Sequence, residues 1–418
     1  MDKLVIDGGT RVRGRVRISG SKNATLPIMA ACLLTGKECV LHQVPDLDDV
    51  KVMENVLAGL GASVKREAST LIIDPGSVNA WEIPEHTSRK MRASNLVMGA
   101  LLGKFGQAKV SYPGGCAIGQ RPMDIHLGGL RQLGYKVEEC YGYIEGYFSE
   151  AVDSDITLDF PSVGATENLM MAAVISSRNT VIRNAAREPE IVDLQNFLNK
   201  MGARIRGAGL GVIRIEGVPE LNGVEHEVIP DRIEAGTFMI MAAASRGDII
   251  VENVVFEHLG AITSKVRETG AEVIAYNGGS LRILGNRKLG SADIKTMPYP
   301  GFPTDAQPQM MAFLSGVEGT SVMVETIFEN RYMHVNELRR MGADIKVEGR
   351  VAILKGKSRL RGTTVEATDL RAGAALIVAG VSGSGETQIE NAFHIDRGYE
   401  KIEEKLHSLG VKAFRIRD

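Results

Sequence analysis

The chain has 418 residues, of which 44% are hydrophobic, 24% charged and 5% aromatic. This composition excludes disordered, collagenous and membrane-spanning proteins, and the length predicts two domains. Lysine and arginine number 49 against 51 acidic residues, so the net charge of -2 provides no basic field for nucleic acid. The N-terminus lacks the pattern of a signal peptide, and the four cysteines form no CxxC pair. We therefore expect a cytoplasmic protein with reduced thiols and no nucleic-acid or membrane partner.

A glycine recurs at nearly constant spacing, each time after an amphipathic helical pattern. In one such pattern Leu194, Phe197, Leu198 and Met201 follow the i, i+3, i+4, i+7 spacing of one helix face. After each glycine the hydrophobic pattern changes to the period of two that is typical of a strand. The glycine fits the left-handed position that ends a helix. Successive positions differ by 73, 68, 68, 72 and 68 residues: Gly61, Gly134, Gly202, Gly270, Gly342 and Gly410.

A second predicted helix precedes the amphipathic one in each repeat and is apolar on nearly every side, which indicates full burial. These helices are expected at 23–34, 94–102, 167–175, 234–244, 306–314 and 371–379. Strands follow them, as at 39–41 and 181–183, and the glycine-rich segment 380–385 predicts a turn. Six α/β units result, most simply divided into three and three near Pro230.

Segment 112–122 departs from this repeat. Three glycines fall within 114–119, with Cys116 among them and Arg121 shortly after. The composition predicts a mobile loop, and a nearby cation favours the reactive thiolate form of a cysteine. The alternative is a tight turn with an incidental thiol.

Several cations lie near the starts of the predicted buried helices. Lys22, Arg92 and Arg371 have this position, and Arg397 precedes the last helix. A cation opposes the helix dipole there, whereas a bound anion satisfies both the cation and the helix end. Each cation taken alone can be a solvated or salt-bridged surface charge. Together they predict a shared anion-binding cleft.

Asp305 precedes the fifth buried helix and has two interpretations. It is either an ordinary N-cap or a general base for a substrate hydroxyl. His126 and His394 show no metal-ligand spacing, and no phosphate-binding GxxxxGK[ST] loop occurs.

Short motifs spread over the full length give the chain a family resemblance. They are Gly-Ser-Lys-Asn-Ala at 20–24, Pro-Gly-Gly-Cys-Ala-Ile-Gly at 113–119, Gln-Arg-Pro at 120–122, Ser-Val-Gly-Ala at 162–165, Pro-Thr-Asp at 303–305 and His-Ile-Asp-Arg-Gly at 394–398. In this order they resemble the UDP-N-acetylglucosamine 1-carboxyvinyltransferase family, the enolpyruvyl transferases that commit sugar nucleotide to peptidoglycan synthesis.

The resemblance implies an α/β fold: a two-domain inside-out α/β barrel of six βαβαββ-like units of about 70 residues. The first domain is expected at 21–229 and carries the Cys116 lid loop. The second is expected to combine 1–20 with 230–418, and the active site to lie in the cleft between them. Family members require no metal and no organic cofactor.

The implied reaction moves the enolpyruvyl group of phosphoenolpyruvate to the 3-hydroxyl of UDP-N-acetylglucosamine and releases phosphate by addition and elimination. Cys116 resembles the lid residue that adds to phosphoenolpyruvate; whether it acts as the acid or assists product release stays open. Lys22, Arg121 and Arg397 are expected to bind phosphoenolpyruvate, and Asp305 to take or orient the hydroxyl proton. The antibiotic fosfomycin is expected to alkylate Cys116.

The sugar-nucleotide site is implied by further matching positions. Its expected residues are Asn23, Arg92, Arg121, Pro122, Met123, Asp124, Ile125, Ser162, Val163, Gly164, Asp305 and Ile327. Supporting roles are expected for Arg371, Asp231 and Arg331, although Arg331 can equally form a structural ion pair. Phe160 and Pro161 stand where some members carry a lysine, so contacts to the uridine end are expected from the backbone.

Two alternatives remain at this stage. The sister enolpyruvyl transferase that acts on shikimate 3-phosphate shares the repeat and the chemistry, but segments 115–117 and 162–164 argue against it. A catalytically silent repeat scaffold fits the repetition alone. It gives no reason for a thiol in a glycine loop or for cations at helix starts.

Overall fold

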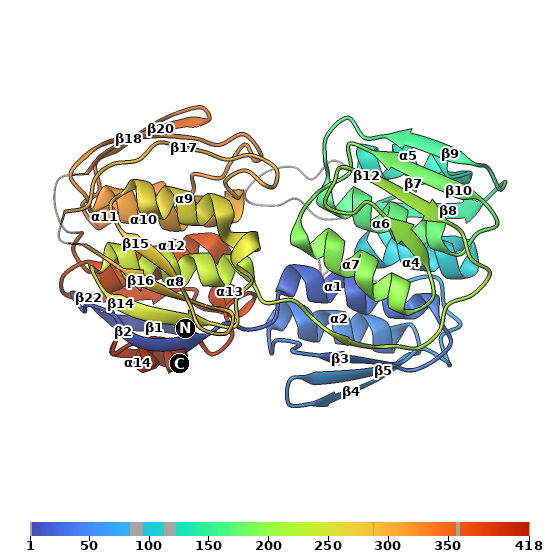
Figure 1. Ribbon diagram of the computed structural model, residues 1–418, viewed down its shortest axis with the longest axis horizontal. Helices are drawn as coiled ribbons and strands as arrows, with labels where there is room; N and C mark the ends of the chain where they lie inside the picture. Colours follow the sequence, from blue (N-terminus) through green and yellow to red (C-terminus); the bar gives the residue numbers. More distant parts are fainter. Residues whose placement is uncertain (1, 84–94, 113–122, 287, 357–359, 418) are drawn as a thin grey trace. The chain divides into compact units, whose positions relative to one another are not determined.

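Figure 1 shows the computed structural model, which describes residues 2–83, 95–112, 123–286, 288–356 and 360–417. The chain forms two compact units. The described residues between Gly20 and Ile229 make up one, called here the middle unit; Met1–Ser19 and Pro230–Asp418 make up the other, called the terminal unit. The chain thus leaves the terminal unit after Ser19 and returns to it at Pro230.

The middle unit contains three repeats of helices and strands. The first holds α1 (Lys22–Ala31), a 3-10 turn (Cys32–Leu34), β3 (Cys39–His42), α2 (Asp48–Gly59), β4 (Ser63–Glu67) and β5 (Thr70–Asp74). The second holds α4 (Leu96–Phe105), β6 (Gln107–Ser111), α5 (Asp124–Gln132), β7 (Tyr135–Cys140) and β8 (Tyr143–Phe148). The third holds β9 (Ser154–Thr157), α6 (Val163–Val174), β10 (Asn179–Arg183), α7 (Pro189–Lys200), β11 (Arg204–Arg206) and β12 (Val212–Glu216), and β13 (Glu225–Glu227) follows.

The terminal unit repeats the same order of elements. Its first repeat holds β2 (Arg13–Arg17), α8 (Arg232–Ala244), β14 (Asp248–Glu252), a 3-10 turn (Phe256–Leu259), α9 (Gly260–Glu268), β15 (Glu272–Tyr276) and β16 (Ser280–Leu284). The second holds β17 (Ile294–Lys295), a 3-10 turn (Thr304–Ala306), α10 (Gln307–Ser315), β18 (Gly319–Val324), α11 (Val335–Arg340), β19 (Ile345–Glu348) and β20 (Val351–Gly356). The third holds β21 (Thr364–Glu366), α12 (Leu370–Ser382), β22 (Glu386–Glu390), α13 (Phe393–Asp396), α14 (Ile402–Ser408), β23 (Ala413–Arg417) and β1 (Asp2–Asp7).

The described strands form six small sheets with one shared topology. Five have four strands, in the orders β13-β3-β5-β4, β9-β10-β12-β11, β2-β14-β16-β15, β17-β18-β20-β19 and β21-β22-β1-β23. In each of these the first pair is parallel and the other pairs are antiparallel. The sheet β6-β8-β7 has three strands, and an isolated parallel bridge from Glu82 to Lys109 occupies the place of the first strand.

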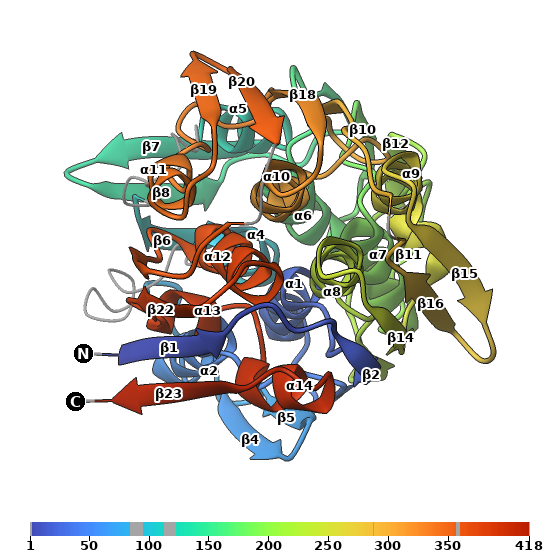
Figure 2. The ribbon, with the colours of Figure 1, turned by 90° about the vertical axis from the view of Figure 1, so that its left-hand side faces the viewer.

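The termini of the chain complete one of these sheets. Strand β1 pairs with β22 and with β23, so that Leu4 lies opposite both Ile389 and Arg415. Figure 2 shows β1 and β23 side by side with the two chain ends close together. The last repeat therefore takes one of its four strands, β1, from the opposite end of the chain.

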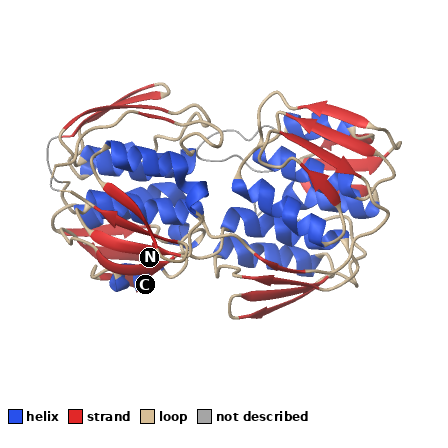
Figure 3. Ribbon diagram, in the orientation of Figure 1, coloured by secondary structure: helices blue, strands red, loops and turns tan. Residues whose placement is uncertain are grey.

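Within each unit the nearly fully buried helix of each repeat lies inside and the sheets lie outside, as Figure 3 shows in blue and red. The predicted apolar helices correspond to α1, α4, α6 in the middle unit and α8, α10, α12 in the terminal unit, and their side chains are mostly buried. Strands bury alternate residues, as β20 does along its length. The helices thus form a separate apolar core in each unit.

The glycine prediction is confirmed at all six positions. These residues have φ values from +80° to +109° just after the second helix of each repeat. A side chain rarely adopts this conformation, whereas glycine does so without steric cost. At Gly134 an added Cβ would lie 2.0 Å from the carbonyl oxygen of Glu150, so close packing imposes the same choice.

Two sequence predictions need correction. The helix expected at 23–34 ends at Ala31 and continues as a 3-10 turn. The turn expected at 380–385 is wrong for its first half, because α12 continues to Ser382. Gly380 belongs to the helix, where an added Cβ would lie 3.3 Å from the Thr387 side chain, so its role is close packing rather than chain reversal.

Candidate functional site

The predicted site residues are distributed over both units. Four of them, together with the rest of the predicted lid loop at 113–122, lie outside the described residues: Arg92, Cys116, Arg121 and Pro122. The remaining ones lie mostly at the starts of the buried helices and in the loops that follow strands of the terminal unit.

Lys22 is the first residue of α1, and the hydroxyl of Ser21 caps this helix by accepting a hydrogen bond from the Ala24 amide. Its Nζ lies 3.0 Å from Oδ2 of Asp49, at the start of α2; the two side chains are 12% and 18% exposed. Asp49 supplies part of the negative charge that the sequence analysis assigned to a bound anion. An ammonium carries three N–H groups and can hold an anionic ligand in addition. Asn23 follows on α1 and is half-buried.

Met123, Asp124 and Ile125 begin helix α5. Met123 is the N-cap residue and only 2% exposed, so its side chain belongs to the core. Asp124 is exposed in the first turn, where a carboxylate favours the helix dipole, and Ile125 is half-buried. Of the three side chains, Asp124 is the most accessible.

Ser162, Val163 and Gly164 form the start of α6. The Ser162 hydroxyl accepts a hydrogen bond from the Ala165 amide at 3.3 Å, and all three residues are half-buried. A Cβ on Gly164 would lie 3.1 Å from Cε1 of His126. The glycine therefore allows the imidazole to approach the helix backbone closely.

A buried amide links three helices at this place. The side-chain nitrogen of Asn168 lies 3.1 Å from Nδ1 of His126 and donates to the Gly164 carbonyl at 3.2 Å. Its side-chain oxygen accepts from the Gly99 amide at 2.6 Å. This connection of α4, α5 and α6 was not predicted, because nothing in the local sequence pairs residues 42 and 69 positions apart.

In the terminal unit Asp305 lies between two buried guanidinium groups. Its Oδ1 accepts from Nη2 of Arg331 and its Oδ2 from Nη2 of Arg371, each at 2.9 Å. The arginine side chains are 2% and 5% exposed, whereas that of Asp305 is 28% exposed. Asp305 lies in a 3-10 turn that has no side-chain cap, so the N-cap interpretation is wrong. Two charge-assisted hydrogen bonds instead fix the direction of a partly accessible carboxylate.

Arg371 owes its position to the start of α12. Asp369 caps this helix by accepting from the Arg371 amide at 2.9 Å and from the Ala372 amide at 3.2 Å. Burial is the largest single influence on the pKa of Arg371 and lowers it, but the negative charge of Asp305, together with the smaller contributions of Tyr399 and Asp231, outweighs burial and the pKa is raised. Arg371 therefore stays a permanent cation despite its burial.

Arg371 also contacts a buried, hydrogen-bonded cluster formed by Tyr399, Thr237 and Gln309. Its Nη1 donates to the Tyr399 hydroxyl at 3.4 Å, which lies 2.9 Å from the Thr237 hydroxyl. The side-chain nitrogen of Gln309 lies within 3.2 Å of both hydroxyls and donates to the Asp305 carbonyl at 2.9 Å. Burial raises the pKa of Tyr399, so its hydroxyl is a neutral partner. This support was not predicted, because its residues come from four segments that lie far apart in the sequence.

Asp231 and Arg331, for which supporting roles were predicted, have different contacts in the structure. Asp231 is the N-cap of α8, where its carboxylate accepts from the Ile233 and Glu234 amides at 2.8 and 3.0 Å; it is 6% exposed. Arg331 forms the ion pair that the sequence left open and also donates twice to the Thr304 carbonyl. Asp231 therefore has a structural contact, while Arg331 contacts the candidate site directly.

Arg397 is half-buried and follows directly after α13. The preceding Asp396 forms hydrogen bonds of 2.5 and 2.8 Å with Arg415 in β23. Arg415 also pairs with Glu403 at 2.5 Å and with Asp2 at 3.1 Å, which ties this loop to both ends of the chain. Ile327 is half-buried in the loop after β18.

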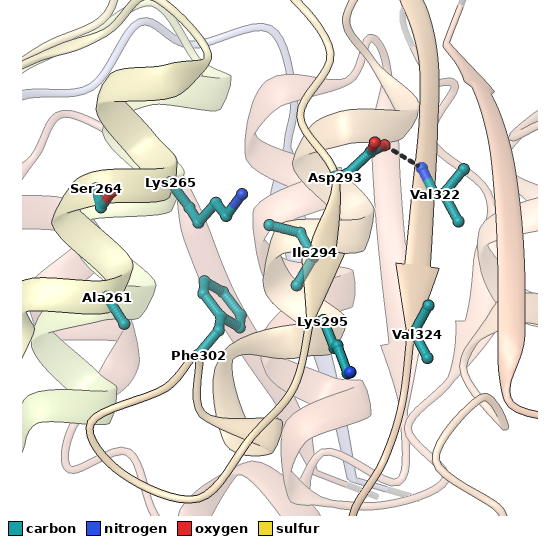
Figure 4. A pocket seen from close by; sticks show the side chains of 9 residues that line it. All are labelled: Ala261, Ser264, Lys265, Asp293, Ile294, Lys295, Phe302, Val322 and Val324. Carbon is teal, nitrogen blue, oxygen red and sulfur yellow. Dashed lines mark hydrogen bonds between the residues drawn. The ribbon is translucent and has the colours of Figure 1, made fainter.

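A pocket of about 500 Å³ lies elsewhere in the terminal unit, between α9 and the strands β17 and β18. Figure 4 shows Lys265 and Lys295 among its lining side chains, with Ile294 and Phe302 between them. Of the predicted site residues that are described, none lines it.

Among the described residues no cluster of three His, Cys, Asp or Glu side chains suits a metal ion. No helix in the described part of the chain is both long and apolar enough to span a bilayer.

Comparison with known proteins identifies the family. A family model described as EPSP synthase (3-phosphoshikimate 1-carboxyvinyltransferase) matches residues 6–406. The UDP-N-acetylglucosamine 1-carboxyvinyltransferase 2 of Carboxydothermus hydrogenoformans is 55% identical, and the match covers 100% of both chains. The chain belongs to the UDP-N-acetylglucosamine 1-carboxyvinyltransferase family. The resemblance drawn from six short motifs is thereby confirmed.

Solved structures support the fold of this 1-carboxyvinyltransferase family member. The enolpyruvyl transferase NikO from Streptomyces tendae has a TM-score of 0.88 at 22% identity, over 99% of this chain and 98% of that one. An EPSP synthase from Acinetobacter baumannii has a TM-score of 0.79 at 16% identity over 100% of both chains. The chain thus has the enolpyruvyl transferase fold, a mixed α/β fold with six small sheets in its described part.

Proposed function

We propose that this protein transfers the enolpyruvyl group of phosphoenolpyruvate to the 3-hydroxyl of UDP-N-acetylglucosamine and releases phosphate. The 55% identity to a 1-carboxyvinyltransferase of this substrate over the whole of both chains carries the proposal. The reaction is a step in peptidoglycan synthesis. Its substrates are cytoplasmic metabolites, so the protein acts in the cytoplasm.

The chemistry proceeds by addition and elimination. A proton adds to the methylene carbon of phosphoenolpyruvate while the sugar oxygen bonds to the neighbouring carbon and loses its own proton. The tetrahedral adduct then loses a methyl proton and phosphate, which restores the double bond. The two steps need an acid, a base and cations for the carboxylate and the phosphate.

Asp305 accepts or orients the proton of the sugar hydroxyl in this proposal. Its partial exposure and its two fixed oxygens support the role, because a hydrogen-bond acceptor must meet the hydroxyl at a defined angle. Arg331 and Arg371 hold the carboxylate in this direction. Ile327 and the residues at the starts of α5 and α6 contact the sugar nucleotide.

Lys22, Arg121 and Arg397 bind phosphoenolpyruvate, and Cys116 adds to it or supplies its proton. The ammonium of Lys22, held at the start of α1 by Asp49, supports this assignment. Cys116 is also the group that fosfomycin alkylates; intact-protein mass spectrometry tests this, and an unmodified Cys116 after incubation would contradict it.

The proposed residues come from both units, so both are needed for one active site. We assign the fold to an inside-out α/β barrel with six copies of one βαβαββ repeat. The shared strand order of the six sheets supports the repeat. Arg92, Asn23, Pro122 and the segment 162–164 complete the nucleotide side.

Phosphate release is the direct test. The protein is assayed with phosphoenolpyruvate and UDP-N-acetylglucosamine, and each substrate is omitted in turn. We expect release only when both are present, and none when shikimate 3-phosphate replaces the sugar nucleotide. Phosphate release from phosphoenolpyruvate with shikimate 3-phosphate as acceptor, but not with UDP-N-acetylglucosamine, would assign the protein to the sister reaction. No release with either acceptor would contradict the enzymatic proposal and favour a silent scaffold.

A further inference from the structure

The buried carboxylate of Glu325, at the end of β18, has no assigned role although it contacts three segments around the candidate site. We infer that Glu325 is a positioning residue that sets the direction of Asp305 and presents the backbone at Ile327 to the sugar nucleotide. The inference rests on the proposed function of these two residues and extends it to a side chain that touches no substrate.

Glu325 is 1% exposed, and its carboxylate accepts four hydrogen bonds. Oε1 accepts from the Thr296 hydroxyl at 2.9 Å, from the Ile327 amide at 2.8 Å and from the Phe328 amide at 3.2 Å. Oε2 accepts from the Thr304 hydroxyl at 3.0 Å. A carboxylate is an acceptor with two oxygens, so it suits these four donors.

One contact of Glu325 leads to Asp305. Thr304 precedes Asp305 in the 3-10 turn, and its carbonyl accepts from Nε and Nη2 of Arg331 at 3.3 and 3.2 Å. Nη2 of the same arginine donates to Asp305 Oδ1. Glu325 therefore fixes Thr304 through its hydroxyl while Arg331 fixes it through its carbonyl. The backbone that leads into Asp305 is therefore held by two side chains, one on the hydroxyl and one on the carbonyl of Thr304.

The other contacts of Glu325 shape the loop after β18. Two consecutive amides, those of Ile327 and Phe328, point to the same carboxylate oxygen. The Thr296 hydroxyl, which donates to this oxygen, accepts from the Thr326 amide at 2.9 Å. This arrangement turns the chain away from the strand immediately after Glu325. The Glu325 carboxylate thus accepts the two amides that define the backbone at Ile327, while Thr296 holds the preceding residue.

The experiment compares three variants by steady-state kinetics with both substrates varied. In Glu325→Ala the turn is no longer fixed, and a displacement of reacting groups by about 1 Å lowers rates by about 10²-fold. We expect kcat/KM for UDP-N-acetylglucosamine to fall by about this factor, with the KM for phosphoenolpyruvate changing less. Glu325→Gln keeps an acceptor for the two amides and can donate to Thr304, so it should recover most of the activity.

Thr304→Val separates the two contacts. It removes only the hydroxyl next to Asp305, so kcat should fall while the KM for UDP-N-acetylglucosamine stays near the wild-type value; Thr304→Ser should restore kcat. Ser321→Ala is the matched control on the same strand. Its hydroxyl is 1% exposed and accepts from the Ala292 amide at 3.2 Å, far from the loop after β18.

The outcomes are distinct. If wild type is active and Glu325→Ala and Thr304→Val have the kinetics of Ser321→Ala, the positioning role is overturned while the proposed function stands. If Glu325→Ala does not fold, the pair Thr304→Val and Thr304→Ser decides: a kcat that does not respond to the hydroxyl overturns the role. Wild type without phosphate release refutes the proposed function itself.

Discussion

The two units share one scaffold, but a lysine–aspartate pair at a helix start in one differs from an arginine–aspartate–arginine group in the other. In the middle unit Lys22 and Asp49 are similarly exposed, and the ammonium stands at a helix start. In the terminal unit the guanidinium groups of Arg331 and Arg371 are almost fully buried, and the carboxylate of Asp305 is the accessible member. At Lys22 the cation and its partner are thus about equally accessible, whereas at Asp305 the acceptor is the accessible member and the cations are buried.

The difference shows how a repeat can support two roles. Both sites begin from the same kind of element, the start of a buried helix: α1 for Lys22 and α12 for Arg371. The charge of each site depends on which neighbouring segment supplies the partner: the first turn of α2 for Lys22, and the 3-10 turn before α10 for Arg371. The buried helices provide fixed positions, and the neighbouring segments determine the chemistry.

The largest expected effect comes from removing the acceptor of the terminal unit. Asp305→Asn keeps the shape and one carbonyl oxygen but removes the charge that assists hydroxyl deprotonation. We expect kcat to fall by about 10³-fold, within the range typical of a lost general base. Steady-state phosphate release at saturating substrates measures this.

An exposed carboxylate in the same unit provides the control for that prediction. Asp293 Oδ1 accepts from the Val322 amide at 2.8 Å and lies away from Asp305, at the pocket beside α9. Asp293→Asn should retain wild-type kcat. If Asp305→Asn stays within tenfold of wild type, the acceptor role of the terminal unit is wrong.

The next effect should come from the cation of the middle unit. Lys22→Met removes the ammonium, and we expect kcat/KM for phosphoenolpyruvate to fall by about 10²-fold, the equivalent of two lost charge-assisted hydrogen bonds. Asp49 loses its cation at the same time, so the melting temperature should also fall. The double variant Lys22→Met, Asp49→Asn should recover stability but not activity. Recovery of both would show that Lys22 has only a structural role.

The sequence predicted the scaffold and the family more fully than it predicted the site. Hydrophobic period and recurring glycines identify the buried helices and their ends because these are local properties. The partners of Lys22 and Asp305 are not local: Asp49 lies 27 positions from Lys22, and Arg371 lies 66 positions from Asp305. A period shows which face is buried but not which charge it meets. The support by Tyr399 and Glu325 therefore became visible only in three dimensions.

A third prediction concerns the start of the middle unit. An added Cβ on Gly20 would lie 1.8 Å from the carbonyl oxygen of Gln43, a backbone atom that cannot move alone. Gly20→Ala should lower the free energy of unfolding by about 3 kcal/mol, the upper range for overpacking. Gly128→Ala in α5 is the contrast, because its Cβ would meet nothing within 4 Å and helix propensity favours alanine by about 1 kcal/mol. Urea titrations of both variants should give shifts of opposite sign; equal shifts would contradict the packing argument.

The smallest effect concerns acid sensitivity in the terminal unit. His334 is fully buried, and burial lowers its pKa to about 4, with Asp369 raising it and Arg331 lowering it to lesser extents. Between pH 6.5 and 4 the unfolded chain binds a proton at this residue that the folded chain does not. The contribution of His334 to the free energy of unfolding is therefore complete above pH 6.5 and declines as the pH falls. At pH 5 the loss amounts to about 2 kcal/mol.

The variant His334→Leu isolates this contribution from the other groups that titrate in the same range. Wild type and variant are melted at pH 7.5 and pH 5, and the difference between their pH-dependent shifts is the quantity of interest. We expect wild type to lose more stability on acidification, because protonation of His334 would place a positive charge in a fully buried position and, to a lesser extent, close to Arg331. Equal shifts would mean that His334 does not titrate differently on folding, and the acid sensitivity of the terminal unit would then have another source.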